Sequence, residues 1–197
     1  ILACKNGLLH LPTLELLPPT PTYFCHNALD YPFDADALDP VNWLRFLEQL
    51  WPDDRAAVET LQEALGYCLT LDTRQQKIFL LVGPMRSGKG TIGRIATRLL
   101  GQANVCAPTL AGLGTEFGLQ TLIGKQLAII SDARLGSRVD QHGITERLLS
   151  ISGEDGISVP RKFLLDWTGR LPTRFLILTN ELPRLADASG ALAGRFI

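Results

Sequence analysis

The feature that most constrains the fold is the apolar run "KIFLLV" (77–82), which is followed at once by "GPMRSGKGTIGR" (83–94). A buried strand, a glycine-rich turn and a helix in this order form a phosphate-binding loop, and Gly83, Gly88 and Lys89 fit its pattern G-x-x-x-x-G-K. The glycines let backbone N–H groups surround phosphates, and the start of the helix favours negative charge. The stretch therefore predicts a nucleotide-binding loop between a strand and a helix.

The end of this loop departs from the usual pattern. Gly90 stands where Ser or Thr normally supplies the hydroxyl that binds Mg²⁺, so we expect Thr91, the next residue, to supply it. Lys89 places a positive charge near the β- and γ-phosphates. We expect ATP with Mg²⁺ as the ligand. The residues predicted to contact it are Gly83, Pro84, Ser87, Gly88, Lys89, Gly90 and Thr91.

Two further apolar runs, "LAIIS" (127–131) and "RFLILT" (174–179), alternate with helical segments. Such runs are typical of parallel strands buried on both faces, so the fold class is α/β with a central, mainly parallel sheet flanked by helices. Asp132 follows the first run and is predicted to hold Mg²⁺ through water, as in a Walker B strand. Asn180 follows the second and is predicted to orient water or the γ-phosphate. No second acid adjoins Asp132, so the general base is unassigned.

Between these two runs, "SGEDGISVPRKF" (152–163) predicts a strand and a returning segment that together form a hairpin. Its tip would carry Arg161 and Lys162 beside Phe163. Cations neutralise the phosphates of a nucleic acid, and an aromatic face can stack on a base. An ordinary solvated turn would have the same composition, so both interpretations stay open at this point.

Composition adds a division of the chain. Of its 197 residues, 1–70 hold 3 Lys or Arg against 10 Asp or Glu, whereas 71–197 hold 16 against 10. We therefore expect a small, mainly helical N-terminal region over 1–72, with short strands and turns first, and a nucleotide-binding domain over 73–197. Helices are expected to open near Asp39, as N-cap, and to run from about Asp54 to Leu69. The basic balance of the second part suits a polyanionic partner.

Other features of the sequence exclude several classes of protein. No apolar run approaches the ~18–20 residues that span a bilayer, and the start lacks a secretory signal, so we expect a cytoplasmic protein without a membrane partner. The four cysteines and three histidines are scattered, which argues against a zinc site. The chain begins without Met and stops inside the apolar run "GALAGRFI", so we expect it to be truncated at the C-terminus.

The order of "GPMRSGKGT", "LAIISDAR", "SGEDGISVPRK" and "LPTRFLILTNELPRLADASGALAGRF" resembles the superfamily 3 helicases. The likeness is greatest to the phage and plasmid primase-helicase branch, which is related to poxvirus replication helicases, and it covers nearly the whole chain. The resemblance implies a P-loop ATPase core of the AAA+ type that forms a ring, often a hexamer, around single-stranded DNA. It also implies a phage or mobile-element protein in the cytoplasm of a bacterial host, with a primase domain or protein as a further partner.

The resemblance also implies roles for single residues. Lys89 and Thr91 would bind phosphates and Mg²⁺, Asp132 would be the Walker B acid, and Asn180 would be the sensor 1 residue. The basic pair of the hairpin would track DNA. Arg195, in "GALAGRF", would be an arginine finger. The lone acid at Walker B departs from the paired acids of the wider superfamily, which leaves the residue that activates water unassigned.

Two other functions fit parts of the sequence. A loader or scaffold that binds ATP and DNA but hydrolyses weakly would suit the lone acid Asp132. A nucleoside monophosphate kinase shares the ending "GKGT" of the loop (88–91), but the sequence lacks the "DGFPR"-like strand end and the Arg-rich lid of those kinases. The main prediction from the sequence is therefore an ATP-dependent, replicative DNA helicase.

Overall fold

The computed structural model describes residues 1–136, 139–183, 185–187 and 190–197. It divides into two compact units, Ile1–Thr70 and Leu71–Ile197, and each is described by itself. None of the helices in these described stretches has both the length and the apolar character needed to cross a bilayer.

The first unit begins with a three-stranded antiparallel sheet in the order β1-β2-β3. Its strands are β1 (Leu2–Cys4), β2 (Gly7–His10) and β3 (Glu15–Leu17). The apolar side chains of Leu2, Leu9 and Leu29 are buried together and form a small core under this sheet. The prolines that follow β3 keep the chain in irregular structure as far as residue 40.

Two helices complete the first unit. The first, α1 (Val41–Leu50), begins later than predicted: Pro40 is its N-cap, with a ψ of 66°, and no side chain caps it, so Asp39 lies outside the helix. The second, α2 (Arg55–Leu69), begins where the sequence predicted, because the carboxylate of Asp54 accepts a hydrogen bond from the N–H of Ala57 at 2.9 Å.

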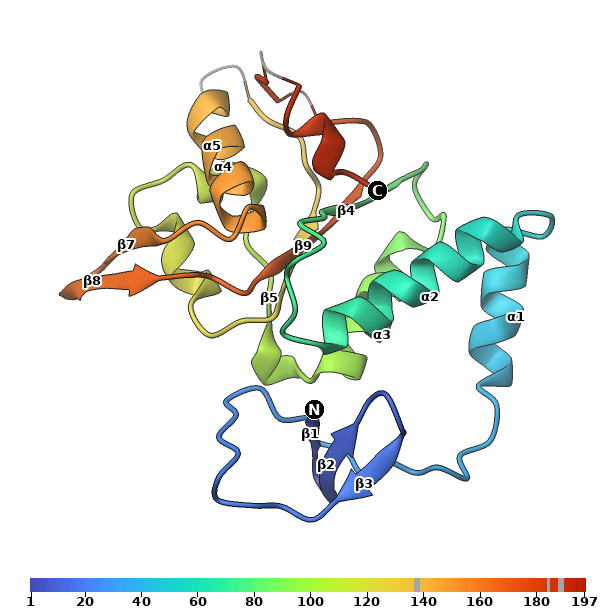
Figure 1. Cartoon of the computed structure of the whole chain (residues 1–197). Coiled ribbons are helices and arrows are strands. Elements are labelled where there is room, and N and C mark those ends of the chain that lie inside the picture. The colour runs from blue at the N-terminus through green and yellow to red at the C-terminus, as the bar shows by residue number, and fades with distance from the viewer. Residues whose placement is uncertain (137–138, 184, 188–189) are drawn as a thin grey trace. The chain divides into compact units, whose positions relative to one another are not determined.

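The second unit is built on a four-stranded sheet in the order β4-β9-β6-β5, in which every pair is parallel (Figure 1). The strands are β4 (Phe79–Val82), β5 (Val105–Cys106), β6 (Leu127–Ser131) and β9 (Arg174–Thr179). The three apolar runs predicted as strands are therefore strands β4, β6 and β9. Strand β5 was not predicted, because a strand of two residues is too short to show an apolar run or an alternating pattern in the sequence.

A segment near the end of the chain pairs with the free edge of β4. Ile78 forms a parallel bridge with Phe196. The N–H of Ile78 donates to the carbonyl of Arg195 at 2.8 Å, and the N–H of Ile197 donates to the carbonyl of Ile78 at 3.0 Å. The last described residues thus extend the sheet beside the amino end of β4.

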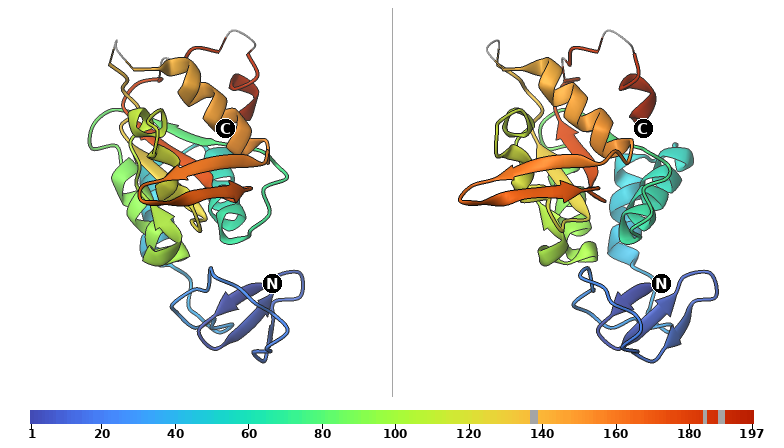
Figure 2. Two further views of the ribbon diagram at one scale, coloured as in Figure 1. Left: turned by 90° about the vertical axis from the view of Figure 1, so that its left-hand side faces the viewer. Right: turned by 60° about the vertical axis from the view of Figure 1, so that its left-hand side comes forward.

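Helical segments cover both faces of this sheet (Figures 1 and 2). On one face, α3 (Lys89–Leu100) packs closely, because Gly93 leaves room for Leu178 and Ile129. On the other face, the side chains of Ile130 and Ile177 are fully buried in a core. The helical segments that contribute to that core are α4 (Leu110–Leu113), η2 (Gly118–Leu122) and α5 (Gln141–Ser152).

An antiparallel hairpin of β7 (Ile157–Arg161) and β8 (Leu164–Gly169) follows α5. It extends away from the parallel sheet of its own unit in Figure 1 and in the right-hand view of Figure 2. Arg161 pairs with Leu164, so the turn consists of the two residues Lys162 and Phe163. The hairpin predicted from the sequence is therefore present.

Candidate nucleotide-binding and hydrolysis site

Three of the predicted site residues follow three adjacent parallel strands. The phosphate-loop motif follows β4, Asn180 follows β9 and Asp132 follows β6, and β9 lies between the other two strands. The carboxyl ends of parallel strands share one edge of a sheet, and ligands of open α/β sheets bind at that edge. The N–H of Asp132 donates to the carbonyl of Leu178 at 2.9 Å, which fixes the end of β6 against β9.

The loop has the backbone that its glycines allow. Gly88 is the N-cap of α3 with a φ of 84°, and Arg86 also has a positive φ, of 64°. Gly88 has no side chain to cap α3, so within the described residues no cap side chain accepts from the first-turn N–H groups. A Cβ on Gly83 would lie 3.0 Å from the hydroxyl of Ser87, so the loop is tightly wound. These features suit an anion at the start of the helix.

Lys89 points its ammonium group into this loop. Its Nζ donates to the carbonyl oxygens of Gly83 at 2.6 Å and Pro84 at 2.8 Å, and to the hydroxyl of Ser87 at 3.1 Å. A charged donor is therefore held in the middle of the loop by three weaker, neutral acceptors. A phosphate oxygen could replace these acceptors, because hydrogen bonds between two charged groups are the stronger ones.

Thr91 offers its hydroxyl in the first turn of α3. The guanidinium of Arg94 donates to its Oγ1 at 2.9 Å, three residues further along the helix. A Cβ on Gly90 would meet the Nη1 of Arg94 at 3.5 Å, an ordinary contact. The position at Gly90 therefore has room for a small side chain, and Thr91 already has a hydrogen-bond donor beside it.

Asp132 is engaged by a neighbouring arginine. Arg134 donates through Nε to both carboxylate oxygens at 3.0 Å and through Nη2 to Oδ2 at 2.7 Å. These hydrogen bonds, and then the positive charge itself, hold the pKa of Asp132 below its ordinary value. Asp132 also has a φ of 116°, a backbone angle that residues other than glycine rarely adopt. Such backbone strain is typical of functional sites.

The end of β9 carries two polar residues. Asn180 is exposed, and Glu181 follows it. The hydroxyl of Thr179 donates to the carbonyl oxygen of Glu181 at 2.8 Å and so fixes the turn after the strand. Asp132 first, and then Glu181, raise the pKa of the Arg134 guanidinium. A second acid, Glu181, thus acts on Arg134, the arginine that pairs with Asp132.

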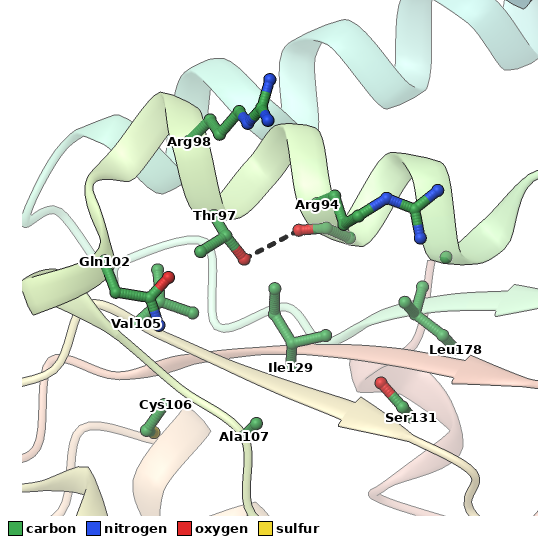
Figure 3. A pocket seen from close by; sticks show the side chains of 12 residues that line it. Arg94, Thr97, Arg98, Gln102, Val105, Cys106, Ala107, Ile129, Ser131 and Leu178 are labelled. Atoms are coloured by element: carbon green, nitrogen blue, oxygen red, sulfur yellow. Dashed lines mark hydrogen bonds between the residues drawn. The ribbon is translucent and has the colours of Figure 1, made fainter.

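A cavity of about 510 Å³ lies between α3 and the sheet (Figure 3). Gly90 and Arg94 line it from the beginning of α3, and Ser131 lines it from the end of β6. Ile129 and Leu178 form its apolar floor below the helix in Figure 3. The cavity therefore adjoins both the phosphate loop and the strand that ends before Asp132.

The turn of the hairpin exposes a basic residue, Lys162, beside an apolar one, Phe163. The Nζ of Lys162 lies 5.1 Å from the centroid of the Phe163 ring, which is 93% exposed. The Nε of Arg161 donates to the carbonyl of Leu165 at 2.7 Å, and the N–H of Lys162 donates to Oε1 of Gln120 at 3.1 Å. The turn is therefore braced while its ring and ammonium group face solvent.

Arg195 does not join the other predicted site residues. It ends η3 (Ala193–Arg195) beside the amino end of β4, whereas the phosphate loop lies at the carboxyl end of the same strand. Its Nη1 donates to the side-chain oxygen of Gln76, and to the backbone carbonyl of Gln76 at 3.5 Å. Any effect of Arg195 on a nucleotide would therefore concern a site other than the one in its own chain.

The residues present fit a magnesium nucleotide. In the part of the chain that the structure describes, no group of three or more His, Cys, Asp or Glu could hold a metal. A cation at this edge of the sheet would thus need ligands from phosphates, with the hydroxyl of Thr91 and the carboxylate of Asp132 as the candidates from the protein. Such sparse protein ligation is the usual arrangement for Mg²⁺ with a nucleotide.

Sequence reasoning missed three side chains that the structure brings to the predicted residues: Arg94, Arg134 and Gln76. Arg94 follows Thr91 by three residues on a helix, a spacing that places two side chains side by side. It could have been found from the sequence. Gln76 lies far from Arg195 in the chain, and no sequence signal joins the two.

The second unit is an α/β fold with a parallel sheet, and solved structures resemble this chain in fold. The apo structure of the NrS-1 C-terminal region matches with a TM-score of 0.63 and 18% identity, over 80% of this chain and 37% of that one. A JCV helicase bound to a small molecule matches with a TM-score of 0.53 and 18% identity, over 77% of this chain and 41% of that one. This chain thus spans well under half of either chain.

The chain belongs to the family of unknown function DUF5906, whose model matches residues 81–195. The D5 N terminal like model matches residues 1–52. Together with the solved structures, these matches confirm the resemblance predicted from the sequence, to superfamily 3 helicases of the phage and viral type. The family description assigns no activity, so the function must be argued from the site.

Proposed function

We propose that this chain is the P-loop, AAA+-type ATPase part of a replicative DNA helicase of the phage or plasmid type. The observation that carries the proposal is the order β4-β9-β6, which brings the phosphate loop, Asn180 and Asp132 to one edge of the sheet. A cation, an amide and a carboxylate at adjacent strand ends are the groups that phosphoryl transfer to water requires.

Each residue then has a defined task. Lys89 exchanges its three neutral acceptors for phosphate oxygens, and the first turn of α3 binds the same phosphates through its N–H groups. Mg²⁺, bound with the nucleotide, would neutralise charge on the phosphoryl oxygens, with Thr91 and Asp132 as its candidates in the protein. Asn180 orients the attacking water or the γ-phosphate. Asp132 would hold Mg²⁺ through water, with its carboxylate oriented by the hydrogen bonds from Arg134.

The DNA-binding task falls to the β7–β8 hairpin. We propose that Arg161 and Lys162 contact the phosphates of single-stranded DNA and that the exposed ring of Phe163 stacks on a base. In a ring, for which the family resemblance implies a hexamer, these tips would line a central opening. A primase domain or protein and the cytoplasm of a bacterial host remain part of the same proposal.

Arg195 is proposed as an arginine finger for an adjacent subunit. Its place at the amino end of β4 keeps it from the phosphate loop of its own chain. Such fingers contribute roughly 10³–10⁵ in rate where they have been measured. The full-length Arg195→Ala and Lys89→Ala proteins should each be nearly inactive, yet mixed rings should regain ATPase activity where an intact loop meets an intact finger.

The test of the function is ATP turnover with and without single-stranded DNA. A motor should hydrolyse ATP faster when DNA is present, and Lys89→Ala should abolish turnover in both conditions. DNA binding with turnover no higher than in Lys89→Ala would instead support the loader or scaffold with weak hydrolysis, which the lone acid Asp132 favours. Phosphoryl transfer from ATP to AMP would support the kinase.

The hairpin is tested separately by DNA affinity. Replacement of both Arg161 and Lys162 by Ala should weaken binding of single-stranded DNA and reduce its salt dependence by about 0.7 for each phosphate that the protein no longer neutralises. Arg170→Ala, an exposed arginine just beyond the other end of β8, is the matched control and should change neither quantity comparably. Equal affinity in the double variant and the wild type would remove the hairpin tip from DNA binding.

A further inference from the structure

Gln76 has an unusual backbone for its residue type. Its φ is 55°, in the left-handed region of backbone conformation that residues other than glycine rarely adopt. Its N–H donates to the carbonyl of Thr73 at 2.8 Å, so a tight turn precedes β4. Backbone strain of this kind persists only where the surroundings hold it, and it gathers at functional positions.

The side chain of Gln76 holds Arg195. Its Oε1 accepts from the Nη1 of Arg195, and its backbone carbonyl accepts from the same Nη1 at 3.5 Å. The backbone there is fixed as well, since Lys77 donates to the carbonyl of Gly194 at 2.8 Å. Among the described residues, the hydrogen bonds of the Arg195 side chain use Nη1 alone, so its Nε and Nη2 keep donors for an acceptor in another chain.

The other end of the same amide reaches the segment before the hairpin. The Nε2 of Gln76 donates to the carbonyl of Gly153 at 3.3 Å, and the hydroxyl of Thr73 donates to the carboxylate of Glu154. Gly153 is the C-cap of α5, and its turn leads directly into β7. A Cβ on Gly153 would lie 3.6 Å from Nη2 of Arg195, so the three segments are in contact.

We propose that Gln76 is a positioning residue that orients Arg195 toward the ATP site of an adjacent subunit and joins it to the base of the β7–β8 hairpin. The inference rests on the proposed function, in which Arg195 is a finger and the hairpin binds DNA. One planar amide accepts from the guanidinium and donates to the turn at residue 153. A shift of the hairpin base on DNA binding is therefore passed to Arg195 through two hydrogen bonds.

Two variants separate the two halves of this link. Gln76→Ala removes both side-chain hydrogen bonds, so ATP turnover should fall by about tenfold, the effect of one hydrogen bond to a charged group. Gln76→Glu has the same size and still accepts from Arg195, but it can no longer donate to the carbonyl of Gly153. In the absence of DNA, Gln76→Glu should therefore hydrolyse ATP faster than Gln76→Ala. Its stimulation by DNA should be lost to the same extent as in Gln76→Ala.

Mixed rings of the full-length protein show which side of the interface Gln76 serves. Gln76→Ala should regain activity when it is mixed with Lys89→Ala, as Arg195→Ala does, and should regain none when it is mixed with Arg195→Ala. If Gln76→Ala instead damaged the ATP site of its own chain, it should regain activity when mixed with Arg195→Ala and none when mixed with Lys89→Ala. Thermal unfolding of each variant shows that the protein is folded.

The results that overturn the inference differ from those that overturn the function. If Arg195→Ala and Lys89→Ala complement each other while Gln76→Ala hydrolyses ATP normally, or is rescued by Arg195→Ala, Gln76 has no positioning role. Full DNA stimulation in Gln76→Glu would remove the link to the hairpin. If the wild type hydrolyses ATP no faster than Lys89→Ala, the proposed function fails and this inference fails with it.

Discussion

Lys89→Ala should loosen the phosphate loop as well as remove a charge from the nucleotide site. In the structure the ammonium group donates to two backbone carbonyls and to one hydroxyl of the loop, at 2.6–3.1 Å. The side chain is half-buried, so it does more than present a charge to solvent. The loss of these hydrogen bonds therefore predicts a measurable loss of stability in Lys89→Ala.

The size of the loss follows from these hydrogen bonds. Three hydrogen bonds near the surface contribute about 1 kcal/mol each. Holding a lysine side chain in one conformation costs about 1.5 kcal/mol in entropy. The free energy of unfolding should therefore fall by about 1.5 kcal/mol in Lys89→Ala. On the same basis, Lys125→Ala, which removes one hydrogen bond to the carbonyl of Ala103, should change it by less than about 0.5 kcal/mol.

Denaturant unfolding measures this difference. In a background with Trp43→Phe and Trp51→Phe, Trp167 is the remaining tryptophan and reports on the unit Leu71–Ile197. The midpoint should fall in Lys89→Ala at an unchanged slope, because the slope follows the surface exposed on unfolding. Equal midpoints in Lys89→Ala and Lys125→Ala would refute the reasoning from the hydrogen bonds of the loop.

Nucleotide adds the second half of the prediction. ATP with Mg²⁺ at about 100 times its dissociation constant should stabilise the wild type by about 2.7 kcal/mol. It should leave Lys89→Ala nearly unchanged. If nucleotide stabilises Lys89→Ala as much as the wild type, Lys89 is not part of the binding site, whatever its effect on the loop.

Three other predictions concern single positions. Gly118→Ala should destabilise the second unit by about 3 kcal/mol, because a Cβ there would overlap the carbonyl oxygen of Gly112, and the same denaturant assay measures it. Burial raises the pKa of Cys106 to about 11, so alkylation at pH 8, followed by peptide mass spectrometry, should be about 100-fold slower than for an ordinary thiol and should rise with pH. Hydrogen bonds from Arg74 hold the pKa of Asp72 at about 2. The ionised Asp72 therefore stabilises the folded protein fully above the ordinary pKa of an aspartate, and this stabilisation is lost as pH falls through about 2. Arg74→Ala should return the pKa of Asp72, measured by NMR, to its ordinary range.

The sequence by itself determined the elements whose signals are local. The runs 127–131 and 174–179 are strands with the predicted bounds, because an apolar, β-branched run between polar residues has few other stable conformations. The hairpin itself was predicted, because Gly153 and Gly156 precede its first strand, but its turn was placed only approximately: Arg161, predicted at the tip, is the last residue of β7, and the turn consists of Lys162 and Phe163. The start of α1 was misplaced, because the non-helical backbone of Pro40 keeps Asp39 out of the helix.

The tertiary structure alone decided which strand ends meet. The chain order of β4, β6 and β9 does not say that β9 lies between the other two, since the order of strands in a sheet depends on how the crossing helices pack. The pairing of Arg134 with Asp132 and of Gln76 with Arg195 depends in the same way on backbone geometry and on packing between distant segments. Periodicity and motif spacing describe neighbours along the chain, whereas these pairings arise only when hydrophobic burial brings separate segments together.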